Sequence, residues 1–440
     1  MISLLNNISP DFKKLLSGSS LVMAFKVAGA GAGYIFAYLI TTNYGAESFG
    51  IFELSLTALT IASLFARLGL GGALVRFIPE FVEKGAGVHL RKVYRLALFL
   101  SLPFSIFLGV LLYLYAYELA MVFGNEGLRT PFRIVAHIVP FATSYQINAE
   151  AYRGMKKMTG YSILQRGTVI IIAIAAFFIL QFQGYETHLI PLFSFGTGVV
   201  LLSIFAAFAT PRALSKQVVS QTTFKTDEIA IKPLLKVAFP MLISTSMFMI
   251  MNWTDTLMIG YYLDESEVGI YRLAFKVATL ITFAQFAINS IAAPMFSSFN
   301  AKNDLAGLRK MTRNIGYMNL IISTPIFIAI LIFPSFVLDF FGEEFTAGVA
   351  PLVVLAISQI INAICGPVMY LLNMTGKEKQ ARNIIIVASI INVALNLYFI
   401  PIYGLMGAAI ATGVSTVVWN IMAVFQIKKE YGFISIPHPF

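Results

Sequence analysis

Charged side chains interrupt several apolar stretches of the sequence, and they are the first candidates for chemistry. They are Lys26, Glu53, Arg67, Glu150, Arg166, Lys236, Asp255, Arg272 and Lys276. Inside a membrane helix a charged side chain is costly, so it normally faces an interior cavity and marks the path of an ion or a substrate. Cations predominate in this set, and positive charge in a cavity of low dielectric constant favours an anionic ligand.

Helical periodicity places several of these residues on two polar faces. At about 100° per residue, one face of an earlier segment collects Glu53, Thr57, Thr60, Arg67 and Gly71. One face of a later segment collects Arg272, Lys276, Thr279, Ser290 and Ser297. We expect both faces to line one central lumen. The alternative for Arg272 and Glu53 is a position near the membrane surface, from which they snorkel, whereas Lys276 lies deeper and fits a cavity better.

A carboxylate and an amide mark a third segment, where Asp255 and Asn252 share a helical face. A buried carboxylate needs a partner, and Arg272 or Lys276 on the following helix is the predicted one. Asp255 and Glu53 are therefore predicted to hold these cations in place or to respond to a coupling ion, either H⁺ or Na⁺.

The remaining cation of interest, Lys26, lies among the glycines Gly29, Gly31 and Gly33, which permit close helix approach. Snorkelling is its alternative role. Together these arguments predict five substrate-binding residues, namely Lys26, Arg67, Asn252, Arg272 and Lys276.

Composition identifies the class of protein that contains these residues. The 440 residues are 58% hydrophobic and 12% charged, with a mean hydropathy of +0.80, whereas a soluble chain is about 25% charged. Runs of roughly 20 apolar residues recur along the whole chain, and each is long enough to span a bilayer as a helix. The sequence therefore predicts a polytopic membrane protein.

Several kinds of site are excluded by the same sequence. One cysteine, Cys365, and four scattered histidines offer neither a disulfide framework nor a metal cluster. The sequence contains no GxxxxGK(S/T) motif, the phosphate-binding loop of many ATPases, so ATP hydrolysis is not expected. The net charge of +10 reflects basic cytoplasmic loops rather than nucleic-acid binding.

We predict an all-α membrane protein with twelve spanning helices. Their approximate limits are 19–42, 50–70, 93–117, 131–152, 162–182, 188–210, 233–262, 269–299, 313–341, 349–374, 383–402 and 405–427. Basic and acidic loops alternate along the chain, which places both termini in the cytoplasm by the positive-inside rule. Arg129 and Arg133 break this pattern, because they fall in a loop predicted to face outwards.

Two short repeats divide the chain into related halves. Gly50, Ile51 and Leu54 match Gly269, Ile270 and Leu273, a shift of 219 residues. A second motif, SxxINA, occurs at 144–149 and at 358–363. We therefore predict one six-helix bundle at 1–210, a basic cytoplasmic linker at 211–232 and a second six-helix bundle at 233–440. The bundles should be related by a pseudo-two-fold axis along the membrane normal.

Longer motifs resemble those of a known family. The sequences YGAExFGIF at 44–52 and DTLMIGYYL at 255–263, followed by Val268, Gly269, Ile270 and Tyr271, resemble polysaccharide flippases of the MOP superfamily. LNMTGK at 372–377 and NxxLNLxxIPxYGxxGAAxAT at 392–412 are similar to the C-terminal signature of those proteins. The resemblance implies a V-shaped, MATE-like transporter without an enzymatic site. The implied substrate is an isoprenoid-pyrophosphate-linked oligosaccharide, moved across the cytoplasmic membrane by alternating access.

A lumen that is positive overall suits such an anionic head group. It argues against the first alternative, a MATE-type antiporter that exchanges cationic drugs for H⁺ or Na⁺. A lipid II flippase is a closer alternative, although that family is expected to have additional helices. A membrane polysaccharide polymerase or ligase is a third alternative, disfavoured by short outer loops. The predicted partners are the lipid-linked substrate, membrane lipids and glycosyltransferases or a polymerase of the same pathway, with a monomer as the working form.

Overall fold

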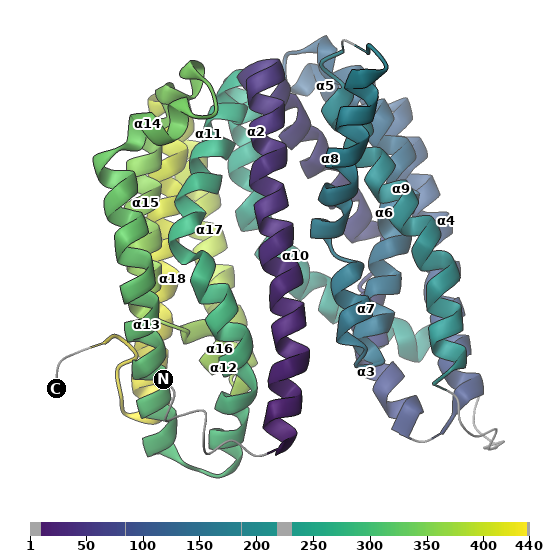
Figure 1. The fold of residues 1–440 in the computed structure, drawn as a ribbon, viewed down its shortest axis with the longest axis vertical. Coiled ribbons are helices and arrows are strands. Elements are labelled where there is room, and N and C mark those ends of the chain that lie inside the picture. The colour runs from purple at the N-terminus through teal and green to yellow at the C-terminus, as the bar shows by residue number, and fades with distance from the viewer. Residues whose placement is uncertain (1–9, 84, 186, 218–230, 438–440) are drawn as a thin grey trace. The chain divides into compact units, whose positions relative to one another are not determined.

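The computed structural model describes residues 10–83, 85–185, 187–217 and 231–437. The elements within these ranges are helices, as expected from the sequence (Figure 1). They form two compact units. Unit 1 comprises Met1–Ile40 and Ile51–Ser246, and unit 2 comprises Thr41–Gly50 and Met247–Phe440. Most of the predicted linker at 211–232 lies outside the described residues, so the division at that linker stays a prediction.

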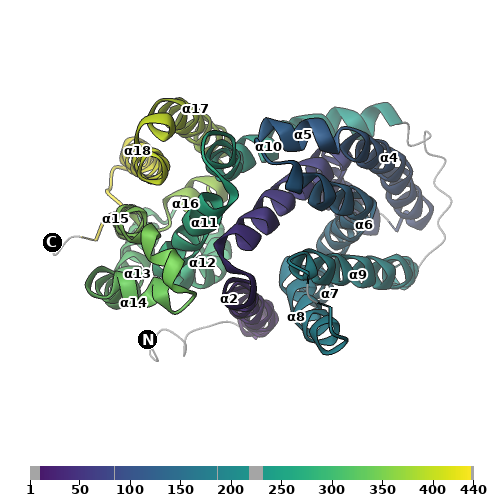
Figure 2. The same ribbon diagram turned by 90° about the horizontal axis from the view of Figure 1, so that it is seen from above.

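Unit 1 is built from helices, and it includes the first part of α10 (Ile231–Tyr262). Besides that part and part of α2 (Pro10–Ala66), it contains α3 (Leu70–Glu83), α4 (Gly87–Leu114), α5 (Ala116–Val122), η1 (Glu126–Leu128), α6 (Arg129–Gly154), α7 (Met158–Ile163), α8 (Arg166–Phe182) and α9 (Ile190–Ser215). Helix α6 is central, because it contacts α3, α4 and α9, and α9 also packs against α8 (Figure 2).

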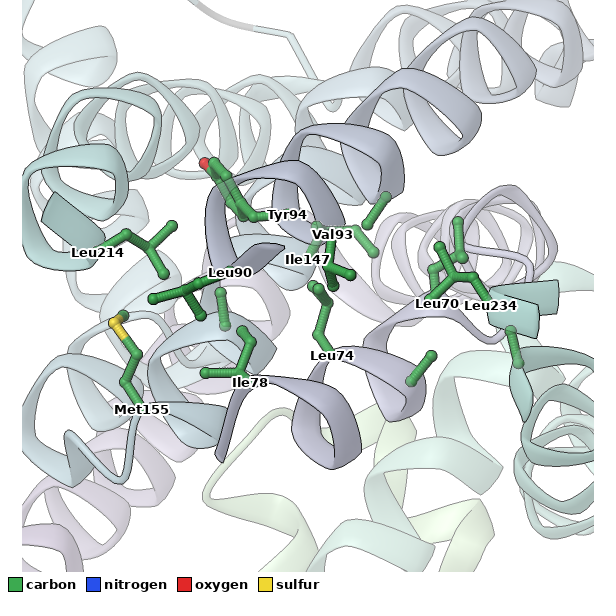
Figure 3. Close-up of a cluster of buried hydrophobic side chains, with 14 residues drawn as sticks. Leu70, Leu74, Ile78, Leu90, Val93, Tyr94, Ile147, Met155, Leu214 and Leu234 are labelled. Carbon is green, nitrogen blue, oxygen red and sulfur yellow. The ribbon is translucent and has the colours of Figure 1, made fainter. Parts of the chain in front are cut away.

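An apolar core joins the helices at one end of unit 1. Leu74 and Ile78 of α3, Leu90 of α4, Ile147 of α6 and Leu234 of α10 are almost completely buried there (Figure 3). Burial of one such side chain contributes about 1.5–3 kcal/mol to stability in water. Since these side chains come from α3, α4, α6 and α10, the core attaches the first turns of α10 to unit 1.

Unit 2 contains the rest of α10 and the helices that follow it. These are α11 (Glu265–Thr279), η2 (Leu280–Thr282), α12 (Phe283–Ala301), α13 (Leu305–Ile332), α14 (Pro334–Asp339), η3 (Glu343–Gly348), α15 (Val349–Cys365), α16 (Val368–Met374), α17 (Glu378–Tyr403) and α18 (Leu405–Tyr431). Helix α18 packs along both α17 and α15, and α15 also contacts α11 and α13.

Several predicted spans are interrupted in the structure. The segment predicted at 349–374 breaks at Gly366, whose φ of 79° suits a residue without Cβ. The segment predicted at 313–341 breaks before Pro334, which begins α14, because proline lacks the backbone N–H that would continue the helix. The segment predicted at 269–299 passes through the 3₁₀ turn η2.

Seven helices are long and apolar enough to cross a membrane among the residues that the structure describes. They are Ala24–Ala66, Gly87–Leu114, Ile190–Ser215, Leu305–Ile332, Glu343–Cys365, Glu378–Tyr403 and Leu405–Tyr431. Two shorter apolar helices are Arg166–Phe182 and Pro233–Leu242. These findings support a multi-pass membrane protein, while the count of twelve spans stays a prediction.

Candidate functional site

A kink at Gly45 interrupts α2 before the first polar face begins at Glu53. Gly45 has φ 77° and ψ −175°, so the chain leaves the helix there and re-enters it at Ala46. The Ala46 N–H donates to Oε1 of Glu344 in η3, at 2.6 Å. A carboxylate at this position caps the new helix and opposes the positive end of its dipole. In α11, Asp264 has the equivalent role, because its Oδ1 accepts from the Glu267 N–H at 2.8 Å.

The glycines that begin the two matching segments, Gly50 and Gly269, meet within unit 2. A Cβ atom added to Gly50 would lie 1.7 Å from the Glu265 carbonyl oxygen, and one added to Gly269 would lie 2.1 Å from the Ala46 carbonyl oxygen. Because Ala46 and Glu265 are also related by the 219-residue shift, the contact is reciprocal. Only glycine allows the two backbones to approach this closely.

Helix α10 positions the buried carboxylate of Asp255, whose side chain is 4% exposed. The Tyr271 hydroxyl donates to Oδ2 at 2.8 Å, and the Asn396 amide donates to Oδ1 at 2.6 Å. The Thr412 hydroxyl also donates to Oδ2. These three donors are neutral side chains, and the ion pair of Asp255 with Arg272 or Lys276 stays a prediction.

Further polar side chains of α17 and α18 surround this carboxylate. The Asn392 amide donates to the Thr412 and Ser415 hydroxyls, each at 3.3 Å. The Asn396 amide also donates to Oδ1 of Asn392 at 3.2 Å. Oδ1 of Asn396 is buried without a hydrogen-bond partner in the structure. A buried acceptor without a donor costs about 1–3 kcal/mol, so it marks a place where a donor or a cation would bind favourably.

The chemistry of this cluster suits a small cation or a proton. Carboxylate, amide and hydroxyl oxygens are the ligands that hard cations prefer. Protonation of Asp255 would also remove the cost of burying its negative charge. The protonated oxygen would then accept fewer hydrogen bonds. Among the described residues no group of three or more His, Cys, Asp or Glu side chains could hold a metal ion, so a multivalent ion would lack charge compensation here.

The predicted cations of unit 2 lie on α11, next to this cluster in sequence. Arg272 directly follows Tyr271 and is partly buried, with Cζ 5.7 Å from the centroid of the Phe275 ring. Lys276 lies one turn further along the same helix and is also partly buried. Asn252 lies on α10, with its side chain outside the described part of the structure. The helix that carries Arg272 and Lys276 therefore also carries Tyr271, a donor to Asp255.

Unit 1 brings Arg67 close to residues of α6. Arg67 Nε donates to the Ser63 carbonyl at 3.2 Å, and its guanidinium lies in electrostatic range of Tyr145 and Glu150. Tyr145 in turn interacts with Arg166 of α8. A pair of cations beside a buried tyrosine hydroxyl is suited to an anion.

Two other predicted residues of unit 1 differ in exposure. Glu53 is 6% exposed, and its carbonyl oxygen accepts from the Thr57 hydroxyl at 2.8 Å. Lys26 is exposed on α2. Close by, Gly29 packs against Gly167 of α8, where an added Cβ would lie 2.7 Å from Cα. The predicted close helix approach near Lys26 is thus confirmed for Gly29.

The sequence argument missed the donors to Asp255 as functional residues. Tyr271, Asn396 and Thr412 are uncharged, as is the neighbouring Asn392, so a search for charges in apolar segments passes over them. One signal that could have found them is the motif at 392–412, because its two asparagines and its threonine fall in this cluster. Tyr271 likewise ends the motif that begins at Val268.

Comparison with known proteins adds independent findings. Residues 15–300 match the family model for polysaccharide biosynthesis proteins, and residues 240–398 match the MatE model. The probable low-salt glycan biosynthesis flippase Agl15 of Haloferax volcanii is 23% identical over 418 residues, which cover 93% of this chain and 82% of that protein.

Two solved structures share the fold. An inward-facing multidrug resistance MATE transporter of the MOP superfamily superposes with a TM-score of 0.73 at 14% identity, covering 92% of this chain and 94% of its own. The lipid II flippase MurJ in an inward closed conformation also gives 0.73, at 16% identity, covering 92% of this chain and 87% of its own. The first family model covers well over half of the sequence. The chain therefore belongs to the polysaccharide biosynthesis protein family.

Proposed function

We propose that this protein is a flippase that moves an isoprenoid-pyrophosphate-linked oligosaccharide across the cytoplasmic membrane by alternating access. The observation that carries the proposal is the similarity to a glycan biosynthesis flippase over 93% of the chain, within a family of polysaccharide biosynthesis proteins. As a member of this family the protein is a transporter rather than an enzyme. Twelve spans in two six-helix bundles, with both termini in the cytoplasm, are part of the proposal.

The cations of the two units are proposed to bind the anionic head group. Arg67 in unit 1 and Arg272 and Lys276 in unit 2 provide the charge, assisted by Lys26 and Asn252. Guanidinium groups bind phosphate oxygens through paired hydrogen bonds, and such charge-assisted bonds are about twice as strong as neutral ones. The isoprenoid tail would stay in the lipid, so the protein would need to shield only the pyrophosphate and the sugars.

Asp255 is proposed to bind the coupling ion, H⁺ or Na⁺. Its support is the burial of the carboxylate, the three neutral donors around it and the unpartnered Oδ1 of Asn396. Transporters commonly hold coupling ions on oxygen atoms in the middle of the membrane. Because Tyr271 and Arg272 are adjacent on α11, a change in the ligands of Asp255 would move the residue that binds substrate. Glu53 is proposed as a partner of the substrate-binding cations.

The second candidate function is an ion-coupled multidrug antiporter of the MATE type. The match of residues 240–398 to the MatE model favours it. The predicted substrate-binding cations argue against it, since Arg67, Arg272 and Lys276 would repel cationic drugs.

A reconstituted transport assay tests these proposals. Protein in liposomes would receive a fluorescent isoprenoid-pyrophosphate oligosaccharide, and a membrane-impermeant reagent would report its arrival in the opposite leaflet. Arg272→Ala and Lys276→Ala should each lower the initial rate by about tenfold, which corresponds to 1.4 kcal/mol. Lys310→Ala is the matched control, because Lys310 is an exposed lysine in α13 outside the candidate site.

Imposed proton and sodium gradients test the role of Asp255. The wild type should respond to one of the two gradients, and Asp255→Asn, which keeps the size of the side chain, should transport at a rate independent of both. Transport of organic cations that is unaffected by changes at Arg272 and Lys276 would support the antiporter instead. If Lys276→Ala and Arg272→Ala both transport the oligosaccharide at the wild-type rate, α11 does not supply the substrate-binding cations.

A further inference from the structure

Two arginines near the start of α6 are not used by the proposed transport site. Arg129 and Arg133 occupy successive turns at the start of α6, which follows α5 and η1 in the chain. Figure 1 shows α5 at the end of unit 1 away from α3 and α7. The positive-inside rule disfavours arginine at the outer membrane surface, where the predicted orientation places them. We propose that Arg129 and Arg133 form a binding site for the phosphate of an anionic lipid head group in the outer leaflet.

Aromatic side chains of α4 and α5 fix both guanidinium groups. Arg133 Cζ lies 4.8 Å from the centroid of the Tyr113 ring, and Arg129 Cζ lies 5.5 Å from that of Tyr117. Tyr113 also makes an edge contact with His137, at 5.3 Å between ring centroids. Stacking leaves the edge of a guanidinium group available for hydrogen bonds to an oxyanion. The site is therefore ordered before a ligand arrives, which lowers the entropy cost of binding.

Acidic residues compensate little of this charge. Among the described residues, the ion pair recorded for these two arginines joins Arg129 to Glu126 at 3.9 Å, and the Glu126 side chain is 66% exposed. An exposed pair of this length contributes about 0–1 kcal/mol. The Nε atoms of both Arg129 and Arg133 are buried without a hydrogen-bond partner in the structure. The charge of the pair is thus available to an anion, whereas the covered Nε atoms hold neither guanidinium group through a hydrogen bond to the protein.

The surface around the pair is apolar and exposed, as expected for contact with lipid. Phe141 lies one turn after His137 on α6 and is 38% exposed, while Leu114 follows Tyr113 on α4 and is 62% exposed. Tyrosine is typical of the level of the lipid head groups, where its ring is in the apolar region and its hydroxyl is in water. A lipid is therefore the occupant that matches both parts of this surface, with acyl chains on the apolar side chains and the phosphate on the arginines.

Photocrosslinking of the full-length protein in phosphatidylcholine nanodiscs tests the proposal. The probe is phosphatidylglycerol with a photoreactive group near the head group, and mass spectrometry locates the crosslinks. We expect crosslinks on residues 106–141, and about a tenfold loss of them in the double variant Arg129→Gln/Arg133→Gln. The double variant Arg129→Lys/Arg133→Lys keeps the charge but not the planar stack, and a smaller loss is expected. Arg76→Gln is the matched control, because Arg76 lies over Phe77 in α3 at a similar distance, 5.9 Å.

Each contrary outcome would overturn the proposal in a distinct way. Equal crosslinking by an uncharged photoreactive diacylglycerol would show that this surface binds lipid through the acyl chains and does not recognise the phosphate. Loss of the crosslinks with excess inorganic phosphate would show that the arginines take the free anion. Crosslinks that persist in the Gln double variant, with an unfolding temperature equal to that of the wild type, would show that the arginines only snorkel.

Discussion

Substitution of either glycine in the contact between α2 and α11 should force the two helices apart. An ordinary van der Waals contact begins at 3.4 Å. A methyl group at Gly50 would lie 1.7 Å from the Glu265 oxygen and one at Gly269 would lie 2.1 Å from the Ala46 oxygen, so the backbones must separate by about 1.7 Å and about 1.3 Å. Both obstacles are backbone atoms, which cannot rotate away as a side chain does.

The expected destabilisation is at the upper end of the range for overpacking, about 3 kcal/mol. For a unit of about 200 residues this lowers the unfolding temperature by about 6–12 °C. The double variant Gly50→Ala/Gly269→Ala should lose less than the sum of the two single variants, because the second methyl enters a space that the first has already opened. Gly50→Ala should be the more severe single change.

The thiol of Cys365 provides the assay, because it is the one cysteine of the chain and is buried in unit 2. A thiol-reactive fluorogenic dye would label it as purified protein unfolds on heating. Gly31→Ala is the control, since a Cβ there has nothing within 4 Å. Alanine in a helix is favoured over glycine by about 0.5–1 kcal/mol. The reasoning is refuted if Gly50→Ala and Gly269→Ala unfold at the same temperature as Gly31→Ala.

Three more predictions use the same assay. Tyr271→Phe removes one donor from the buried Asp255 carboxylate and should cost about 1.5–3 kcal/mol; a variant as stable as wild type would show that another donor takes its place. Glu344→Ala removes the cap of the helix after the α2 kink and should cost about 1 kcal/mol, whereas Glu344→Gln, which keeps an acceptor, should lose less. The contact with Glu430 raises the pKa of Lys377, so the stability it contributes is complete at neutral pH and is lost only as the pH rises through that raised value. The difference between wild type and Lys377→Met should therefore disappear in strongly alkaline solution, and a difference independent of pH would contradict the argument.

Charge in an apolar segment was the signal that found Asp255, since burial of a carboxylate is costly enough to require surrounding donors. Its donors could not be predicted by helical periodicity, because Asn396 and Thr412 lie 141 and 157 residues away along the chain. Their neutral side chains also fit a packing role equally well. Distance in sequence and lack of charge together hide such residues from an analysis of single segments.

Hydropathy predicted where apolar helices lie better than where they break. The apolar run through Gly366 continues on both sides, so composition alone does not reveal the turn there. The backbone conformation shows it, since φ is 79°. The break predicted between the first two spans does occur, because Gly45 has non-helical φ and ψ angles between the two helical parts of α2. The 219-residue repeat was informative in a different way, because it pairs Gly50 with Gly269, the two residues that meet in unit 2.

The reciprocal glycine contact also limits how the gene can change. In a dimer of identical six-helix chains, one codon would specify both sides of such a contact, and a single mutation would alter both together. Here Gly50 and Gly269 are specified by separate codons, so each mutation meets an unaltered backbone on the other side. Neither site has a smaller residue available to compensate for a change at its partner. Both positions are therefore expected to remain glycine, whereas the repeats are free to diverge elsewhere.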